Sequence, residues 1–231
     1  MVIDEAQDVS VAQLRCLAAL GGDRPEGLFF AGDLGQRIFQ QPFSWSSLGV
    51  NIRGRSKTLR INYRTSHQIR RQADRLLDPE ISDVDGNTEK RTDTISVFNG
   101  PTPIIQVYDS EEAEITAVTQ QLSEWKRQGL GPNEIGVFVR SENEIPLATA
   151  AIKAAGLTSL TLTESFETKS GTAALSTMHL AKGLEFRAVV VMACDDEIIP
   201  SQKRIEQMGD SADLEDIYNT ERHLLYVACT R

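Results

Sequence analysis

The sequence has few features of a membrane, secreted or metal-binding protein. None of its apolar runs approaches the roughly 20 residues of a membrane-spanning helix. Its start, Met-Val-Ile-Asp-Glu, lacks the basic and apolar regions of a secretory signal peptide. The three cysteines, Cys16, Cys194 and Cys229, lie far apart and form no C-x-x-C pair. We therefore expect reduced thiols in the core of a cytoplasmic protein that has no membrane partner.

Positive charge is also scarce. The chain has 24 Lys and Arg residues against 33 Asp and Glu residues, and its formal net charge is −9. This balance argues against a protein that bulk charge holds to nucleic acid, although a local basic groove on an acidic protein can still bind DNA. Because 40% of the 231 residues are hydrophobic, a packed core is expected rather than disorder.

A phosphate-binding loop is missing from these residues. No G-x-x-x-x-G-K string followed by Ser or Thr occurs anywhere in the sequence. In nucleotide hydrolases that loop surrounds the triphosphate with backbone N–H groups, a lysine and a hydroxyl that binds Mg²⁺. Any nucleotide chemistry encoded here therefore lacks that part of its site.

Short apolar segments alternate with segments of helical periodicity, which predicts an α/β fold with a parallel sheet. Residues 78–100 are polar and rich in turn formers, so a surface excursion is expected there. An apolar strand that starts at residue 1 and an apolar run that reaches Arg231 lead us to expect a fragment or an internal start. Strands are expected at residues 1–3, 28–31, 59–62, 104–107, 135–139, 158–162, 175–178 and 188–192, and helices at 11–20, 65–77, 110–129, 145–155 and 221–229.

The first string with chemical content is Val-Ile-Asp-Glu-Ala-Gln-Asp at residues 2–8. Two adjacent carboxylates, Asp4 and Glu5, follow an apolar strand. One of them can hold Mg²⁺ through water, and the other can orient and deprotonate a water that attacks a γ-phosphate. For an Asp-Glu pair alone, the other interpretation is a solvated acidic turn that caps a helix.

Two further strings follow the next expected strands. Residues 31–39 read Ala-Gly-Asp-Leu-Gly-Gln-Arg-Ile-Phe, and loops at this place in a parallel sheet face a ligand. Gln36 can sense a γ-phosphate or its attacking water there, whereas the string alone also fits a Gly-rich turn. Asn62-Tyr63-Arg64 offers a ring for stacking and a charged fork for phosphate oxygens, or only a half-buried Tyr beside a surface Arg.

Residues 176–186 read Ser-Thr-Met-His-Leu-Ala-Lys-Gly-Leu-Glu-Phe, a small-residue turn after a strand. Thr177, His179 and Lys182 can meet phosphate there, although His179 by itself also fits a core histidine. Residues 221–231 read Glu-Arg-His-Leu-Leu-Tyr-Val-Ala-Cys-Thr-Arg. A helical stripe that ends in Arg231 suits an arginine finger, or a surface position at a helix end.

In this order, the five strings resemble the signature motifs of superfamily 1 DNA helicases of the UvrD/Rep/PcrA type, over essentially the whole chain. The Gln after Asp-Glu-Ala favours this family over Asp-Glu-Ala-Asp helicases. The resemblance implies an α/β fold of RecA-like parallel sheets with flanking helices, and a motor that uses ATP and Mg²⁺. Residues 1–58 would form the C-terminal part of the first lobe, and residues 59–231 a nearly complete second lobe.

The resemblance also assigns roles around ATP. Asp4 would hold Mg²⁺ and Glu5 would activate water. Gln36 would contact the γ-phosphate and couple it to DNA. Tyr63 would stack on adenine, Arg64 would reach the γ-phosphate and Glu185 would bond the ribose. Gly183 would also belong to the nucleotide-binding residues, and Arg231 would be the arginine finger of the second lobe.

Single-stranded DNA is the partner that the resemblance implies. Thr177 and His179 would touch its phosphates, and Phe39, where the family usually has Tyr, would face a nucleotide base. Where the family commonly has Gly-Trp-Arg-Gly next, this sequence places Trp45 in a shifted register, as a replacement for a DNA-stacking Trp. The interval between Arg64 and Thr177 suffices for the second lobe but not for a large inserted subdomain.

Three interpretations follow from these strings. The first is the C-terminal portion of an active 3′–5′ DNA helicase, cut from its N-terminal lobe. The second is a non-catalytic helicase remnant that binds DNA or a partner protein. The third is a half-site that another chain completes in trans with a phosphate loop.

Overall fold

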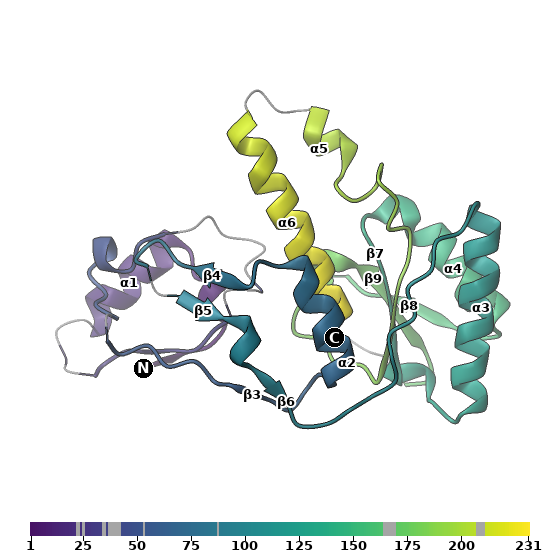
Figure 1. Ribbon diagram of the computed structural model, residues 1–231, viewed down its shortest axis with the longest axis horizontal. Coiled ribbons are helices and arrows are strands. Elements are labelled where there is room, and N and C mark those ends of the chain that lie inside the picture. The colour runs from purple at the N-terminus through teal and green to yellow at the C-terminus, as the bar shows by residue number, and fades with distance from the viewer. Residues whose placement is uncertain are drawn as a thin grey trace. The chain divides into compact units, whose positions relative to one another are not determined.

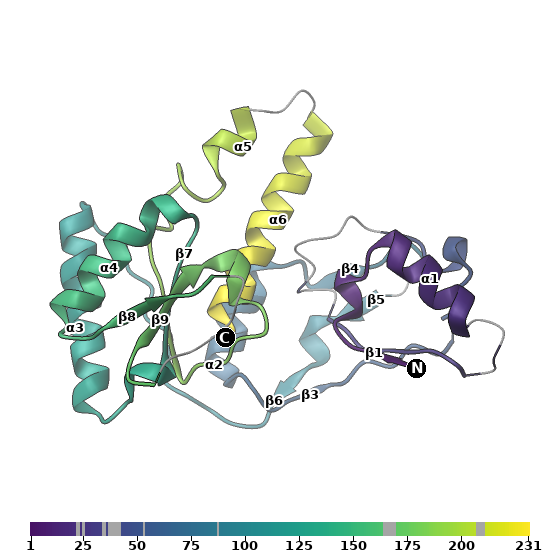
Figure 2. The same cartoon turned by 180° about the vertical axis from the view of Figure 1, so that it is seen from behind.

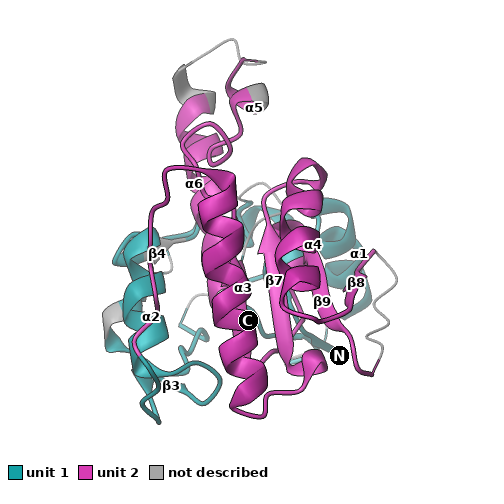
Figure 3. Cartoon of the chain, turned by 90° about the vertical axis from the view of Figure 1, so that its right-hand side faces the viewer, with its two compact units in different colours: residues 1–101 teal, residues 102–231 magenta. Residues whose placement is uncertain are grey.

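The computed structural model of the chain describes residues 1–21, 24, 26–33, 36, 43–52, 54–86, 88–163, 170–206 and 211–231. The chain forms two compact units, a first unit of residues 1–101 and a second unit of residues 102–231 (Figure 3). Each has its own sheets and its own buried apolar cluster. The expected lobe boundary after residue 58 falls inside the first unit, and the assignment of helicase lobes stays a prediction.

In the first unit, strands β1 (Val2–Ile3) and β2 (Phe29–Phe30) pair in parallel, joined by helix α1 (Val11–Gly21). Ser10 precedes the helix, and its hydroxyl accepts the N–H of Gln13 at 3.3 Å. One face of the strand pair packs on a cluster that includes Leu14, Val9, Val50 and Trp45. The other face carries Val2 and Phe29, which are 75% and 62% exposed.

The rest of the first unit contains short elements that depend on one another. Strand β3 (Ile61–Asn62) pairs in parallel with β6 (Ile95–Ser96). Helix α2 (His67–Ala73) is followed by a 3-10 turn, so the helix expected at 65–77 is shorter than predicted. Within the expected surface excursion, β4 (Glu80–Ser82) and β5 (Thr88–Lys90) form an antiparallel hairpin.

The second unit is built on a parallel four-stranded sheet in the order β10-β7-β9-β8. Helix α3 (Glu111–Arg127) and helix α4 (Ile145–Ala154) lie on one side of this sheet, and helix α6 (Ser211–Cys229) lies on the other in both views (Figure 1, Figure 2). A short helix α5 (Gln202–Glu206) precedes α6. The strands are β7 (Ile135–Val139), β8 (Ser159–Thr161), β9 (Ala173–Thr177) and β10 (Ala188–Val191).

The core of the second unit lies between the sheet and the helices α3 and α4. Val137, Leu175 and Ile152 are fully buried in it. Ser110 caps the start of α3, since its hydroxyl accepts the N–H of Ala113 at 3.2 Å. Parallel strands with helices on both faces confirm the predicted α/β class.

Two expectations are wrong. The strand expected at residues 104–107, a fully described segment, is absent, and Ile104, Ile105 and Val107 are 66%, 75% and 95% exposed because no neighbouring strand pairs with them. Cys16 and Cys194 are exposed rather than in the core, and all three cysteines are free. In the part of the chain that is described, no helix is long and apolar enough to cross a membrane.

Candidate functional site

The two adjacent carboxylates lie at the carboxyl end of β1. Because β1 and β2 are parallel, the loop after each strand emerges at the same edge of the sheet. Asp4 and Glu5 are exposed there, and an oxygen of Asp4 accepts the backbone N–H of Glu5 at 2.9 Å. Glu5 adopts the left-handed conformation, with φ 50° and ψ 43°, which non-glycine residues rarely adopt outside functional sites and turns.

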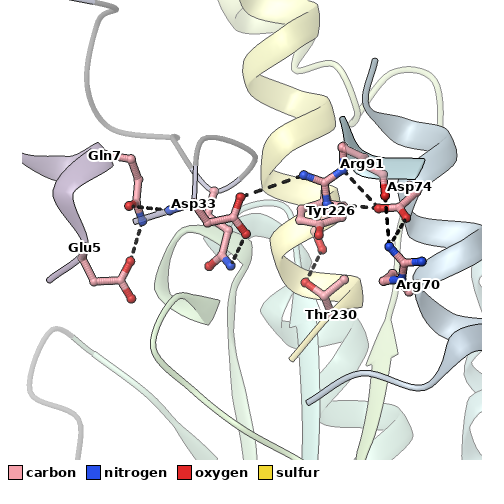
Figure 4. Close-up of polar contacts among 9 residues, drawn as sticks. Glu5, Gln7, Asp33, Arg70, Asp74, Arg91, Tyr226 and Thr230 are labelled. Carbon is pink, nitrogen blue, oxygen red and sulfur yellow. Dashed lines mark hydrogen bonds and ion pairs between the residues drawn. The ribbon is translucent and has the colours of Figure 1, made fainter. Parts of the chain in front are cut away.

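Gln7 connects this loop to the loop after β2. Its side chain is buried, its Nε2 donates to Oε2 of Glu5 at 2.5 Å, and its Oε1 accepts the backbone N–H of Asp33 at 3.0 Å (Figure 4). Nε2 of Gln36 in turn donates to Oδ2 of Asp33 at 2.9 Å. The first unit therefore brings Glu5 and Gln36, both predicted from the sequence, to two ends of one hydrogen-bonded series.

Asp33 also faces an ion-pair cluster that the sequence did not reveal. An oxygen of Asp33 lies 3.9 Å from Nη1 of Arg91, whose Nη2 contacts Asp74 at 3.0 Å (Figure 4). Arg70 contacts the other oxygen of Asp74 at 3.4 Å. Arg91 is 7% exposed, so its charge is compensated in a partly dry environment, which strengthens the attraction.

Trp45 does not present a ring to solvent. It is 9% exposed, and its ring makes edge-to-face contacts with Phe30 and Phe43, with centroids 5.0 Å apart in each case. Asp85 fixes the adjacent turn by accepting the backbone N–H of Trp45 at 2.5 Å and the hydroxyl of Ser44 at 2.6 Å. Trp45 is therefore a core side chain in the described arrangement. The other expected base contact, Phe39, lies outside the described residues.

Tyr63 and Arg64 sit on an exposed turn after β3. The side-chain oxygen of Asn62 accepts the N–H groups of Arg64 and Thr65 at 2.8 and 2.9 Å, which closes the turn. Tyr63 is 72% exposed. An accessible ring on a fixed turn can stack on a planar ligand, as the sequence led us to expect.

In the second unit, Thr177 is the last residue of β9 and His179 lies two residues later, at the carboxyl edge of the sheet. A 3-10 turn over residues 178–181 begins there. Both side chains are half-buried. Burial lowers the pKa of His179, and Arg140 and Arg204 lower that pKa further, against an opposing effect of Glu221. His179 is therefore neutral near pH 7 and offers a phosphate a hydrogen bond rather than a charge.

Two expected nucleotide contacts, Gly183 and Glu185, lie in a loop that returns to the end of α6. Gly183 has φ 80°, a conformation that favours glycine, and Glu185 is exposed two residues later. The backbone N–H of Phe186 then donates to the carbonyl of Arg231 at 3.3 Å. Arg231 is 7% exposed, and its Nε donates to the carbonyl of Val227 at 2.9 Å. The strings at 176–186 and 221–231 are thus neighbours in space.

A buried ion pair missed by the sequence analysis lies next to His179. Nε and Nη2 of Arg140 contact the two carboxylate oxygens of Glu221 at 2.5 and 2.6 Å. Arg204 adds a contact of 3.1 Å to the same carboxylate. Arg140 follows the wholly apolar strand β7, and a charged residue at that position was the only signal in the sequence.

The exposed carboxylates of Asp4 and Glu5 suit a Mg²⁺ ion that is bound mostly by waters and substrate phosphates. Among the described residues, no group of three or more His, Cys, Asp or Glu side chains is arranged to hold a metal ion. Mg²⁺ commonly binds to one or two carboxylates together with waters and substrate phosphates. Asp4 and Glu5, both exposed at the sheet edge, are suited to that mode.

Comparisons with known proteins point to the same family. Residues 149–231 match the model of the UvrD-like helicase C-terminal domain. A Bacillus subtilis (strain 168) protein named "Putative ATP-dependent DNA helicase YjcD" is 48% identical over 59 residues. That alignment covers 25% of this chain and only 7% of the Bacillus protein.

The family match covers most of the second unit from helix α4 onward. It includes the turn with Thr177 and His179, the loop with Glu185, and the end of α6 with Arg231. Residues 149–231 are therefore similar to the C-terminal domain of UvrD-like helicases, the family that the five strings led us to expect.

Proposed function

We propose that this chain supplies the hydrolytic carboxylate, the γ-phosphate sensor and the arginine finger of an ATP-dependent DNA helicase motor. The motor would couple ATP hydrolysis to 3′–5′ movement on single-stranded DNA once a phosphate loop completes the site. The observation that carries the proposal is the hydrogen-bonded series from Glu5 through Gln7 and Asp33 to Gln36 at the carboxyl edge of two parallel strands. This edge is where α/β proteins bind nucleotides.

Each residue has a defined task in this proposal. Glu5 accepts a proton from the water whose oxygen attacks the γ-phosphorus, while the bond to the β-phosphate oxygen breaks and ADP leaves. Gln36 senses the γ-phosphate, and Arg64 and Arg231 compensate the charge that develops on it. Mg²⁺, held with Asp4, would supply charge neutralisation at the phosphates.

The remaining tasks concern the two ligands. Tyr63 stacks on adenine, because its ring is exposed on a turn fixed by Asn62. Glu185, beside Gly183, bonds the ribose from an exposed loop. Thr177 and His179 contact the phosphates of single-stranded DNA, with His179 acting in its neutral form. The lobes would comprise residues 1–58 and 59–231.

A second candidate function is a non-catalytic module that binds DNA or a partner protein. The sequence contains no phosphate loop, and phosphoryl transfer depends on the electrostatic stabilisation that such a loop supplies. Completion in trans by another chain lies between the two candidates, because it restores the loop without changing the roles assigned here.

The test is a single-stranded-DNA-stimulated ATPase assay. The chain would be compared alone and joined to, or mixed with, a first-lobe segment that carries the phosphate loop. Turnover only in the completed form, abolished by Glu5→Gln and unaffected by Glu112→Gln on the exposed surface of α3, supports the proposal. Binding of DNA without turnover in the completed form favours the non-catalytic module.

A further inference from the structure

The side-chain amide of Gln7 has only one orientation that satisfies both of its neighbours. Gln7 is 4% exposed. Its Nε2 faces Oε2 of Glu5, and a carboxylate oxygen can only accept. Its Oε1 faces the backbone N–H of Asp33 at 3.0 Å, and that group can only donate. A primary amide offers both functions about 2 Å apart, and no charged side chain does.

The backbone of the second loop is shaped around this amide. A Cβ added to Gly32 would lie 2.4 Å from Oε1 of Gln7, and 3.1 Å from the backbone nitrogen of Ala6. A substitution there would displace either the amide or the loop that carries Asp33. The backbone N–H of Ala6 also donates to the carbonyl of Ala31 at 2.8 Å, so the two loops are tied on both sides of Gly32.

Glu5 needs support because its backbone conformation is unfavourable. A left-handed φ of 50° costs a non-glycine residue about 1 kcal/mol relative to the right-handed region. The hydrogen bond from Gln7 orients the carboxylate of Glu5 while the backbone of Glu5 stays in the left-handed region. Strained residues of this kind persist where surrounding contacts over-determine them.

We propose that Gln7 is a positioning residue for hydrolysis: it fixes the carboxylate of Glu5 and joins it to the loop of Asp33 and Gln36. This inference rests on the proposed function, in which Glu5 accepts the proton from water and Gln36 senses the γ-phosphate. Because Gln7 itself contacts neither nucleotide nor water in this role, its removal should lower kcat and leave the KM for ATP nearly unchanged.

Two substitutions separate the two halves of the bridge. Gln7→Glu keeps an acceptor for the N–H of Asp33 and replaces the donor to Glu5 by a repelling carboxylate. Gln7→Met keeps the volume and removes both hydrogen bonds. Gln120→Glu, at an exposed position of α3, is the matched control for added charge. Urea unfolding identifies any variant whose loss reflects failure to fold.

The experiment has one arm that needs no catalysis. In the chain alone, amide hydrogen exchange measured by NMR should show a protected Asp33 N–H that is lost in Gln7→Met and retained in Gln7→Glu. In the completed motor, both variants should lower kcat by about 100-fold, the loss that follows small misplacement of a reacting group. The control should change neither quantity.

The outcomes are distinct. An Asp33 N–H that exchanges as fast as an unprotected loop amide in the unsubstituted chain overturns the bridge itself. Unchanged kcat in both folded variants overturns the positioning role while the proposed function stands. A protected Asp33 N–H together with no turnover of the completed, unsubstituted motor overturns the proposed function, and the role of Gln7 in hydrolysis falls with it.

Discussion

Arg140 and Glu221 lie 81 residues apart in the sequence and form a two-point ion pair inside the second unit. Their side chains are 7% and 2% exposed. Arg140 directly follows the central strand β7, and Glu221 belongs to α6, the helix that precedes Arg231. The pair therefore ties the helix with the expected arginine finger to the sheet beside His179.

Breaking this pair on one side should be costly. Arg140→Ala leaves Glu221 buried with only the partly exposed Arg204 beside it, and we expect the free energy of unfolding to fall by about 3–5 kcal/mol. Urea unfolding followed by circular dichroism measures the loss. Arg187→Ala is the control, because its pair with Glu134 is largely exposed and its loss should lower the free energy of unfolding far less. Equal losses in the two variants would contradict the prediction.

The lowered pKa of His179 predicts how salt affects DNA binding. At pH 7.5 the ring is neutral, so His179→Gln should leave the slope of log affinity against log salt unchanged. A charged contact to single-stranded DNA would instead change that slope by about 0.7. Fluorescence anisotropy with a labelled oligonucleotide provides the measurement, with the exposed His67→Gln as control. A slope reduced only in His179→Gln would refute a neutral ring.

The lowered pKa of His179 also makes the stability of the fold depend on pH. The folded pKa of His179 lies below the ordinary 6.5, so the unfolded chain takes up the proton first as pH falls. The contribution of His179 to stability is therefore present above pH 6.5 and is lost as pH falls through the lowered folded pKa. The difference in urea midpoint between the unsubstituted chain and His179→Gln should therefore become smaller as the pH falls below 6.5.

Asp85 should give the first unit a separate acid transition. The hydroxyls of Ser44 and Ser46, and then the backbone N–H groups beside them, lower its pKa from 3.8 to about 2. Stability from this carboxylate is present above pH 3.8 and is lost as pH falls to about 2. In a Trp125→Phe background, Trp45 emission should report this transition, and Asp85→Asn should lack it. Identical acid profiles would show that the turn does not depend on the charge.

Burial of Trp45 predicts an effect on folding rather than on base stacking. Trp45→Ala should lower the free energy of unfolding by about 3–5 kcal/mol through the cavity it leaves. Tyr63→Ala, at a 72% exposed position, should cost less than about 0.5 kcal/mol. Trp45→Leu, which removes the aromatic ring and keeps an apolar side chain, should keep the affinity for single-stranded DNA when folded, whereas loss of a stacking ring costs about 1–3 kcal/mol per base. A loss of that size in folded Trp45→Leu would support the stacking role.

Local signals in the sequence predicted those elements whose stability is local. Residues 135–139 form β7 as expected, because five consecutive apolar residues are bounded by turn formers. Ser110 caps the start of α3, and Gly129, with φ 89°, follows its end. Strand β6 was missed because a two-residue strand exists only through its pairing with β3. The mostly apolar residues 104–107 gave a false strand, since no strand among the described residues pairs with them.

The same division holds for the candidate site. Asp4 and Glu5 were proposed because the full string Asp-Glu-Ala-Gln-Asp after an apolar strand is more specific than an Asp-Glu pair alone. The bridge through Gln7 depends on a backbone N–H of a distant loop, and the pair of Arg140 with Glu221 depends on packing across the sheet. Neither partner can be inferred from spacing alone.

The left-handed backbone at Glu5 is unfavourable for folding, although Glu5 carries the carboxylate that we propose accepts the proton from water. Glycine tolerates φ 50° without steric cost, but Glu5→Gly would also leave Nε2 of the buried Gln7 without its acceptor. Glutamate at this left-handed position therefore contributes through its carboxylate what glycine, the residue that suits the backbone best, cannot contribute.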